Sequence, residues 1–273
     1  MQQGTNEWHE WRRKGVGASE SAAILGLCPY STAFDVFMDK TGRAEAFEGN
    51  AATQRGQDLE GKARAMYELI SMEDMPPMCA VHPKYDFLRA SLDGLRADGK
   101  KILEIKCPGA ESHEKAKAGI VPDHYMIQIQ HQLAVTGADS CDYFSYSYKD
   151  GSHALVEVLP NLETQAKIVL AAEEFWTKNV LADSAPPLTD RDTKIIVNNP
   201  ECEQLCLKIK ELKLKDDKRA IAKIELDTLK AMAVALGGHP KIKCGDVRIS
   251  TVNRNGKFSF HKLTINSENK EAP

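Results

Sequence analysis

The sequence predicts an α/β domain followed by a smaller segment of helices and a β-hairpin. Helical and strand patterns are interspersed up to residue 181, which is typical of a sheet flanked by helices. A segment with two consecutive prolines, residues 183–187, then interrupts the pattern. Beyond it the chain is first helical in pattern and then reads as a final hairpin. We therefore expect a domain at residues 1–185 and an appendage at residues 190–273.

The α/β domain begins with predicted helices. The strongest is the fourth, in which apolar residues recur at helical spacing. Another helix is predicted later in the domain. Pro122 can open it as its first residue, and Gly137 can end it. The predicted helices of this domain are residues 6–14, 18–25, 33–41, 53–70, 122–136 and 162–181.

The predicted strands are short and bounded by proline and glycine. Three of them can form a meander, and two more can form a hairpin around Lys149–Asp150–Gly151. These strands are residues 78–81, 87–91, 101–106, 141–148 and 153–159. In the appendage, residues 201–236 read as one helix or as two that meet near residues 216–217. Residues 242–251 and 257–260 read as the final hairpin, with its turn at residues 253–256.

The composition is that of a globular protein that dissolves in water. Hydrophobic residues make up 42% and charged residues 27% of the 273 residues, and no apolar run approaches the roughly 18 residues that span a bilayer. The first thirteen residues lack the apolar core of a signal peptide, so we expect a cytoplasmic protein. The net charge of −3 argues against a generally basic nucleic-acid coat protein but leaves room for local basic groups.

The seven cysteines are scattered and form no Cys-x-x-Cys pair. Their odd number and the expected location favour free thiols. An iron–sulfur cluster needs four clustered cysteines, so we expect none.

Two carboxylates and a lysine form the most informative pattern in the chain. Asp93 precedes Gly94 at the end of one predicted strand, and Glu104 and Lys106 lie on the next. Side chains alternate along a strand, so Glu104 and Lys106 point to the same face. If the two strands are neighbours, Asp93 and Glu104 can share a Mg²⁺ ion, and the Lys106 ammonium can act on a nearby water or phosphate. The alternative is a surface hairpin with solvated charges.

Three further segments carry polar residues that could join this group. Glu60 lies at the edge of the apolar stripe of its helix, and Gln128 falls off the stripe of its own helix. Arg12, with Ser19 at a helix N-terminus, could hold a terminal phosphate. Each has an ordinary alternative when taken alone: a surface glutamate, a helix-packing amide and a solvated arginine.

Taken together, the segments resemble the YqaJ-type viral recombinase family, which includes the lambda exonuclease and has the fold of PD-(D/E)xK nucleases. The resemblance covers about Trp8 to Leu181. The motifs occur in the family's order: Trp8-x₃-Arg12-x₆-Ser19, Arg55–Gly56-x₃-Glu60, Ser91-x-Asp93–Gly94, Glu104-x-Lys106–Cys107–Pro108 and Tyr125-x₂-Gln128-x-Gln130. One departure is Leu92, which stands where the family name has proline.

The resemblance implies a mixed central sheet flanked by helices and a role for each matching residue. The metal ligands would be Asp93, Glu104, Glu60 and the carbonyl of Ile105. Lys106 and Gln128 would complete the catalytic site. The 5′-terminal phosphate and DNA would be bound by Arg12, Ser19, Ser91 and Gln130.

The implied activity is ATP-independent, Mg²⁺-dependent 5′-to-3′ digestion of linear double-stranded DNA, with Mn²⁺ able to substitute. It would release mononucleotides and leave 3′ single strands for a single-strand annealing protein. The enzyme would form a homo-oligomeric ring, with a homotrimer favoured, in the cytoplasm, which is that of a bacterial host if a phage or prophage encodes the chain. A PD-(D/E)xK endonuclease of restriction or repair is the alternative, and a catalytically dead DNA-binding module is a third possibility.

Overall fold

The computed structural model describes residues 1–44, 51–196, 199–214, 220–254 and 257–265. They form two compact units, Met1–Pro186 and Pro187–Pro273, each with its own hydrophobic core. The division falls in the proline-containing segment where the sequence predicts a linker. Both units combine helices with sheets, so the protein is of the mixed α/β class. Within the described residues, no helix is both long and apolar enough to cross a membrane.

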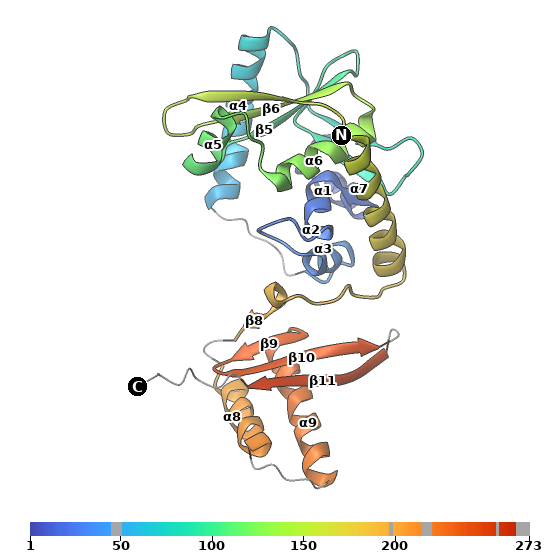
Figure 1. Cartoon of the computed structure of the whole chain (residues 1–273), viewed down its shortest axis with the longest axis vertical. Helices are drawn as coiled ribbons and strands as arrows, with labels where there is room; N and C mark the ends of the chain where they lie inside the picture. Colours follow the sequence, from blue (N-terminus) through green and yellow to red (C-terminus); the bar gives the residue numbers. More distant parts are fainter. Residues whose placement is uncertain (45–50, 197–198, 215–219, 255–256, 266–273) are drawn as a thin grey trace. The chain divides into compact units, whose positions relative to one another are not determined.

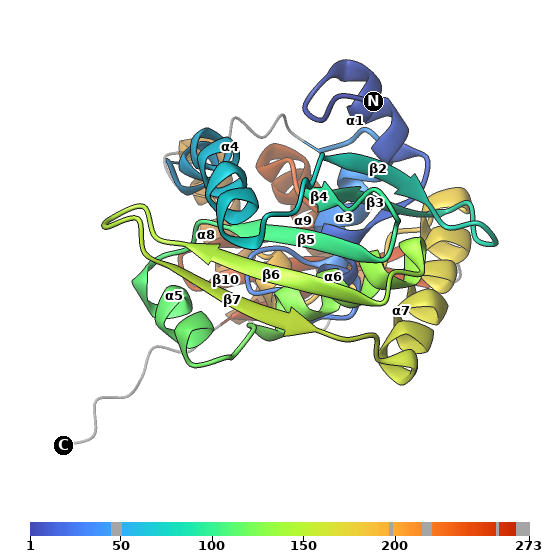
Figure 2. The same cartoon turned by 90° about the horizontal axis from the view of Figure 1, so that it is seen from above.

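A mixed four-stranded sheet forms the centre of the N-terminal unit. Its order is β4 (Gly94–Leu95), β5 (Lys101–Lys106), β6 (Ser140–Tyr146) and β7 (His153–Val158). The central pair β5 and β6 is parallel, and the two outer pairs are antiparallel. Figure 2 looks onto these strands, which run side by side. The connection from β5 to β6 contains α5 (Ala110–Lys117) and α6 (Asp123–Thr136).

A three-stranded sheet and the N-terminal helices complete this unit (Figure 1). Its order is β1 (Val16–Gly17), β3 (Leu88–Leu92) and β2 (Met78–Val81). The helices are α1 (Asn6–Arg13), α2 (Ser21–Ile24), α3 (Ala33–Lys40), α4 (Ala51–Ser71) and α7 (Leu162–Phe175).

Local signals account for several helix ends. The Thr5 hydroxyl caps α1 by accepting from the Trp8 N–H at 3.3 Å. Gly137 ends α6 in the left-handed region at φ +69, and its N–H bonds to the Leu133 carbonyl at 2.8 Å. This end matches the predicted stop at Gly137.

The strand β5 is buried on both faces. Leu103 and Ile105 pack with residues of α4 and β6, including Ala63 and Tyr67. The opposite face, which carries Ile102, belongs to the larger core that contains residues of α6. The two cores hold β5 between α4 and α6. Because side chains alternate along the strand, Glu104 and Lys106 point to the same face as Ile102, toward α6.

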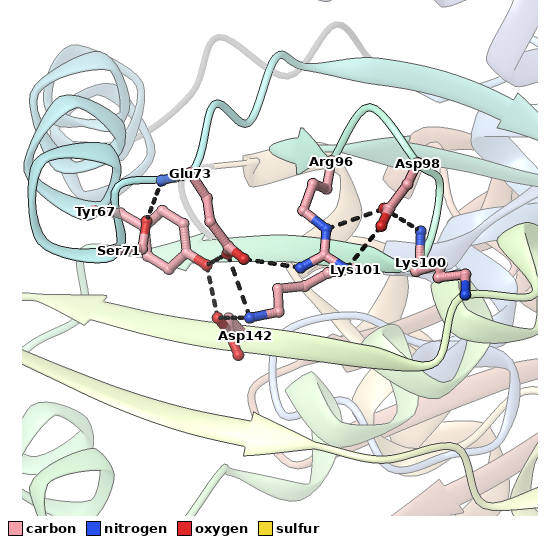
Figure 3. Close-up of polar contacts among 8 residues, drawn as sticks. All are labelled: Tyr67, Ser71, Glu73, Arg96, Asp98, Lys100, Lys101 and Asp142. Carbon is pink, nitrogen blue, oxygen red and sulfur yellow. Dashed lines mark hydrogen bonds and ion pairs between the residues drawn. The ribbon is translucent and has the colours of Figure 1, made fainter.

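A polar network crosses the α4 side of the sheet (Figure 3). The Tyr67 hydroxyl donates to Asp142 at 2.6 Å, and Lys101 pairs with both Asp142 and Glu73, at 3.4 and 3.3 Å. Arg96 joins Glu73 at 2.8 Å. Burial alone would raise the pKa of Glu73, but its bonds to Arg96 and Lys101 bring that pKa below its ordinary value. The network ties α4, β5 and β6 together and fixes the beginning of β5.

The C-terminal unit is a four-stranded sheet with two helices. The strand order is β11 (Lys257–Ile265), β10 (Val247–Arg254), β9 (Lys241–Cys244) and β8 (Lys194–Ile195). The helices α8 (Pro200–Leu214) and α9 (Ala220–Gly237) lie side by side against it (Figure 1).

The structure corrects several sequence predictions. Residues 242–251 are two strands rather than one, because Gly245 at φ +58 turns the chain between β9 and β10. The helix expected to reach residue 181 is α-helical only to Phe175 and continues as π-helix. The strands β1, β4 and β8 and the helix α5 were not predicted. The predicted helix junction at residues 216–217 lies outside the described residues, as does part of the predicted turn at residues 253–256.

A buried ion pair anchors the N-terminal helices. The Glu20 carboxylate contacts Lys40 at 2.8 Å, Arg12 at 2.9 Å and the Gly17 N–H at 2.7 Å. The side chain of Lys40 has no exposed surface, and its ammonium also donates to the Arg12 carbonyl at 2.8 Å. Burial alone would raise the pKa of Glu20, but Lys40 and Arg12 outweigh it and lower that pKa from 4.5 to about 2. This pair holds Arg12 in place.

Replacing Glu20 with Gln should therefore lower the free energy of unfolding by about 3–5 kcal/mol at neutral pH, because Lys40 would stay buried without its counter-charge. The pKa of Glu20 is lowered on folding, so its contribution is full above about pH 4.5 and is lost as the pH falls toward about 2. Urea unfolding of the wild-type and Glu20→Gln proteins at several pH values measures the difference in their free energies of unfolding. This difference should shrink on acidification. Glu111→Gln, which removes only an exposed partner of Lys115, is the control and should change stability little. A difference that does not vary with pH would contradict this account.

Candidate active site and metal centre

The turn between β3 and β4 places Asp93 beside β5. The Asp93 carboxylate accepts a hydrogen bond from the Ile105 N–H at 2.7 Å. Gly94 pairs with Leu103, and a Cβ at Gly94 would lie 2.8 Å from the Cβ and 2.9 Å from the carbonyl oxygen of Met75. Only glycine fits there without a shift of the neighbouring chain. The Asp–Gly step therefore allows β4 to approach β5 closely and brings Asp93 to the strand that carries Glu104.

Glu104 is a buried carboxylate with both oxygens engaged. Its side chain is 1% exposed, and it pairs with Lys106, two positions along the same strand. Gln128 donates to one oxygen at 2.7 Å, and Gln132 donates to the other at 2.6 Å. Both amides come from α6, where positions four apart lie on one face. The strand and the helix therefore fix the orientation of this carboxylate between them.

Burial and the neighbouring acidic groups raise the affinity of Asp93 for a proton. The pKa of Asp93 lies well above its ordinary value because of burial and then because of the negative charge of Glu104, with a smaller contribution from Glu60. Lys106 opposes this shift. Such a set of repelling carboxylates favours a bound cation.

Lys106 stays charged in this setting. Burial alone would lower its pKa, but Glu104 and Asp93 raise it above its ordinary value. The ammonium also lies 5.0 Å from the centre of the Tyr125 ring. The two carboxylates therefore favour the charged form of Lys106.

Glu60 comes to the same region from α4. It pairs with Arg64 at 2.6 Å and is partly exposed, and its charge contributes to the raised pKa of both Asp93 and Cys107. The Ile105 N–H already binds Asp93, and a role for its carbonyl oxygen stays a prediction.

The predicted phosphate-binding residues form a chain of contacts through Trp8. Arg12 donates to the Ser19 hydroxyl at 3.1 Å, and its guanidinium lies 4.8 Å from the centre of the Trp8 ring. The Trp8 indole N–H donates to the Ser91 hydroxyl at 2.8 Å. Gln132 reaches the Ser91 carbonyl at 3.5 Å as well as Glu104. Polar contacts thus run from Arg12 to the carboxylates.

Gln130 does not join this group, and its role in DNA binding stays a prediction. Its side chain is 2% exposed, donates to the Leu159 carbonyl at 2.8 Å and accepts from the Asn161 N–H at 2.7 Å. It secures α6 to the segment before α7. The sequence analysis missed Gln132 instead, although its position four residues after Gln128 on a predicted helix was a usable signal.

Comparison with known proteins places these residues in a family. Residues 7–139 match the family described as YqaJ-like viral recombinase domain. The uncharacterised protein YqaJ of Bacillus subtilis is 32% identical over 187 residues, which cover 67% of this chain and 59% of that protein. An uncharacterised protein of Acanthamoeba polyphaga mimivirus is 25% identical over 157 residues, which cover 52% of this chain and 29% of that protein. The chain thus spans three fifths or less of these relatives.

Solved structures give the fold. An alkaline exonuclease from Laribacter hongkongensis is 28% identical to this chain, with a TM-score of 0.57, and the match covers 66% of this chain and 94% of that one. The structure of the same exonuclease in complex with dAMP has a TM-score of 0.58. The architecture is that of the PD-(D/E)xK type of nuclease. Residues 7–139, which contain the whole carboxylate, lysine and glutamine cluster, are thus similar to the YqaJ-like viral recombinase domain.

Proposed function

We propose that the chain is a metal-dependent, ATP-independent 5′-to-3′ exonuclease that digests linear double-stranded DNA to mononucleotides and leaves 3′ single strands. One observation carries the proposal: Glu104 is buried, held by two amides, and paired with Lys106 beside Asp93. The similarity to an alkaline exonuclease supports the same reaction class. The sequence contains no G-x₄-G-K-[ST] motif, in keeping with a reaction that needs no ATP.

The carboxylates fit a divalent cation. Hard oxygen donors suit Mg²⁺ or Mn²⁺, and the mutual repulsion that raises the pKa of Asp93 is relieved by positive charge. The residues that would hold the ion are Asp93, Glu104, Glu60 and the carbonyl of Ile105. When bound, the ion supplies a Lewis acid for the phosphate and lowers the pKa of a water molecule.

The protein's own groups prepare the site for phosphodiester hydrolysis. Gln128 and Gln132 hold both oxygens of Glu104 through amide N–H donors, which do not themselves titrate. We assign Lys106, which pairs with Glu104, to stabilising negative charge on the scissile phosphate or to positioning or activating the attacking water.

The contacts of Arg12 support action at a DNA end. A guanidinium beside a hydroxyl can bind the extra charge of a 5′-terminal phosphate, which internal phosphates lack. Ser91 connects this group to the carboxylates through Gln132. We propose that Arg12, Ser19 and Ser91 bind this phosphate. We also propose that the chain forms a homotrimeric ring. A single-strand annealing protein would then take the product strand in the cytoplasm of a bacterial host.

Linear duplex DNA labelled at the 5′ or the 3′ end, compared with covalently closed circles, tests the function. With Mg²⁺ the wild-type protein should release the 5′ label first as a mononucleotide, spare the circles, and be inactive in EDTA. Lys106→Ala should lose at least about 10²-fold of this activity, the scale of removing one electrostatic stabiliser, while its circular dichroism stays unchanged. Cutting of closed circles would identify an endonuclease of restriction or repair instead. Undiminished cleavage by Lys106→Ala would remove the assigned site.

Replacing Arg12 with Ala should selectively slow digestion from 5′-phosphorylated ends, because a charge-assisted contact is lost. The measurement is the ratio of initial rates on duplexes with 5′-phosphate and 5′-hydroxyl ends. Arg13→Ala, which removes the exposed neighbouring arginine, is the matched control and should keep the wild-type ratio. An equal rate on both ends in the wild-type protein would refute a terminal-phosphate pocket.

A further inference from the structure

Three cysteines of the C-terminal unit converge on one point. Cys202 and Cys206 lie on α8, and Cys244 ends β9. All three sulfur atoms lie within 4.8 Å of one another. The residues are buried, with exposed fractions of 0%, 3% and 7%.

Their convergence is more than the ordinary burial of small apolar residues. They are all the cysteines of this unit, and they make up three of the nine buried residues in its hydrophobic core. The N-terminal unit has four cysteines, and no comparable group forms among those of its residues that the structure describes. A small unit with so few large apolar side chains gains much from an added cross-link.

We infer that Cys202, Cys206 and Cys244 form a binding site for a thiophilic metal ion, with Zn²⁺ as the expected occupant. Thiolates select soft or borderline cations over Mg²⁺, so this site does not compete for the ion of the carboxylate cluster. Zinc–sulfur bonds of about 2.3 Å in a tetrahedron separate the sulfurs by about 3.8 Å, so the observed spread requires a closing movement of about 1 Å at most.

The thiols lack the features of redox-reactive cysteines. Burial raises the pKa of Cys202 and of Cys206, and the neighbouring cysteines raise the pKa of Cys206 further. Reactive thiols show the opposite shift and are more exposed. Zn²⁺ binds cysteine as the thiolate, so binding would release protons, and the ion would compensate most of the negative charge of its ligands.

The ion would join two elements that are distant in the sequence. It would link α8 to the end of β9, where Gly245 turns the chain into β10. Among the residues that the structure describes, no His, Asp or Glu completes the group, so water or a small anion would take the fourth position.

Titration of the full-length wild-type protein with Cd²⁺ in excess Mg²⁺ tests the inference without any variant. Thiolate–cadmium charge-transfer absorption should rise to a plateau at about one ion per chain and be reversed by excess Zn²⁺, because carboxylates give no such band. Zn²⁺ should also protect these three thiols from a thiol reagent, and a zinc chelator should remove the protection. Absence of the band, or a disulfide among these cysteines in protein purified without reductant, would overturn the inference.

Variants then locate the site. Loss of a hydrogen bond to a metal ligand weakens metal binding by roughly 10–100-fold. Cys206→Ser and Cys244→Ser each remove a ligand itself, so each should weaken Zn²⁺ binding by more than that. Cys28→Ser, at a buried cysteine of the N-terminal unit, is the matched control and should retain full affinity. Unchanged affinity in folded Cys206→Ser and Cys244→Ser would place the metal elsewhere and refute the site.

Discussion

The buried charge of Glu104 is the interaction on which the rest of the candidate site depends. A carboxylate with 1% exposure keeps its charge only if it is paired and hydrogen-bonded, since an unpaired buried charge costs several kcal/mol. Gln128, Gln132 and Lys106 meet this requirement together. They also leave the group poorly able to move, which is what a metal ligand needs. The same interactions therefore stabilise the interior and prepare the chemistry.

Elements on both sides of β5 hold Glu104 in this position. On one side α6 delivers two amides from a single helical face. On the other side α4 packs on Leu103 and Ile105, and the network of Tyr67, Asp142 and Lys101 fixes the beginning of the strand. Asp93 binds the backbone of β5 itself, so its position follows that of Glu104. Asp93 from a turn and Glu104 from a strand are thus both held by β5, which is a rigid element.

Much of this site follows from local sequence patterns. Alternation along β5 is a local property, and it predicts that Glu104 and Lys106 share a face. The choice between Gln130 and Gln132 depends on how α6 rotates against the sheet, and no apolar stripe alone fixes that rotation; the i, i+4 spacing from Gln128 was the missed signal. The meeting of Cys244 with Cys202 and Cys206 depends on long-range packing of β9 against α8. The helix α5 escaped prediction because its exposed, charged sequence shows little apolar periodicity.

Two amides from α6 hold Glu104 in place for the metal binding that we propose. Gln132 and Gln130 lie on the same helix and are both buried amides, at 0% and 2% exposure, but Glu104 accepts a bond from only Gln132 of the two. The direct measurement is the Mn²⁺ affinity, by calorimetry, of folded wild-type, Gln132→Leu and Gln130→Leu proteins. The account predicts that Gln132→Leu weakens Mn²⁺ binding by roughly 10–100-fold, whereas Gln130→Leu keeps the wild-type affinity even if it is less stable. Equal Mn²⁺ affinity in all three proteins would contradict it.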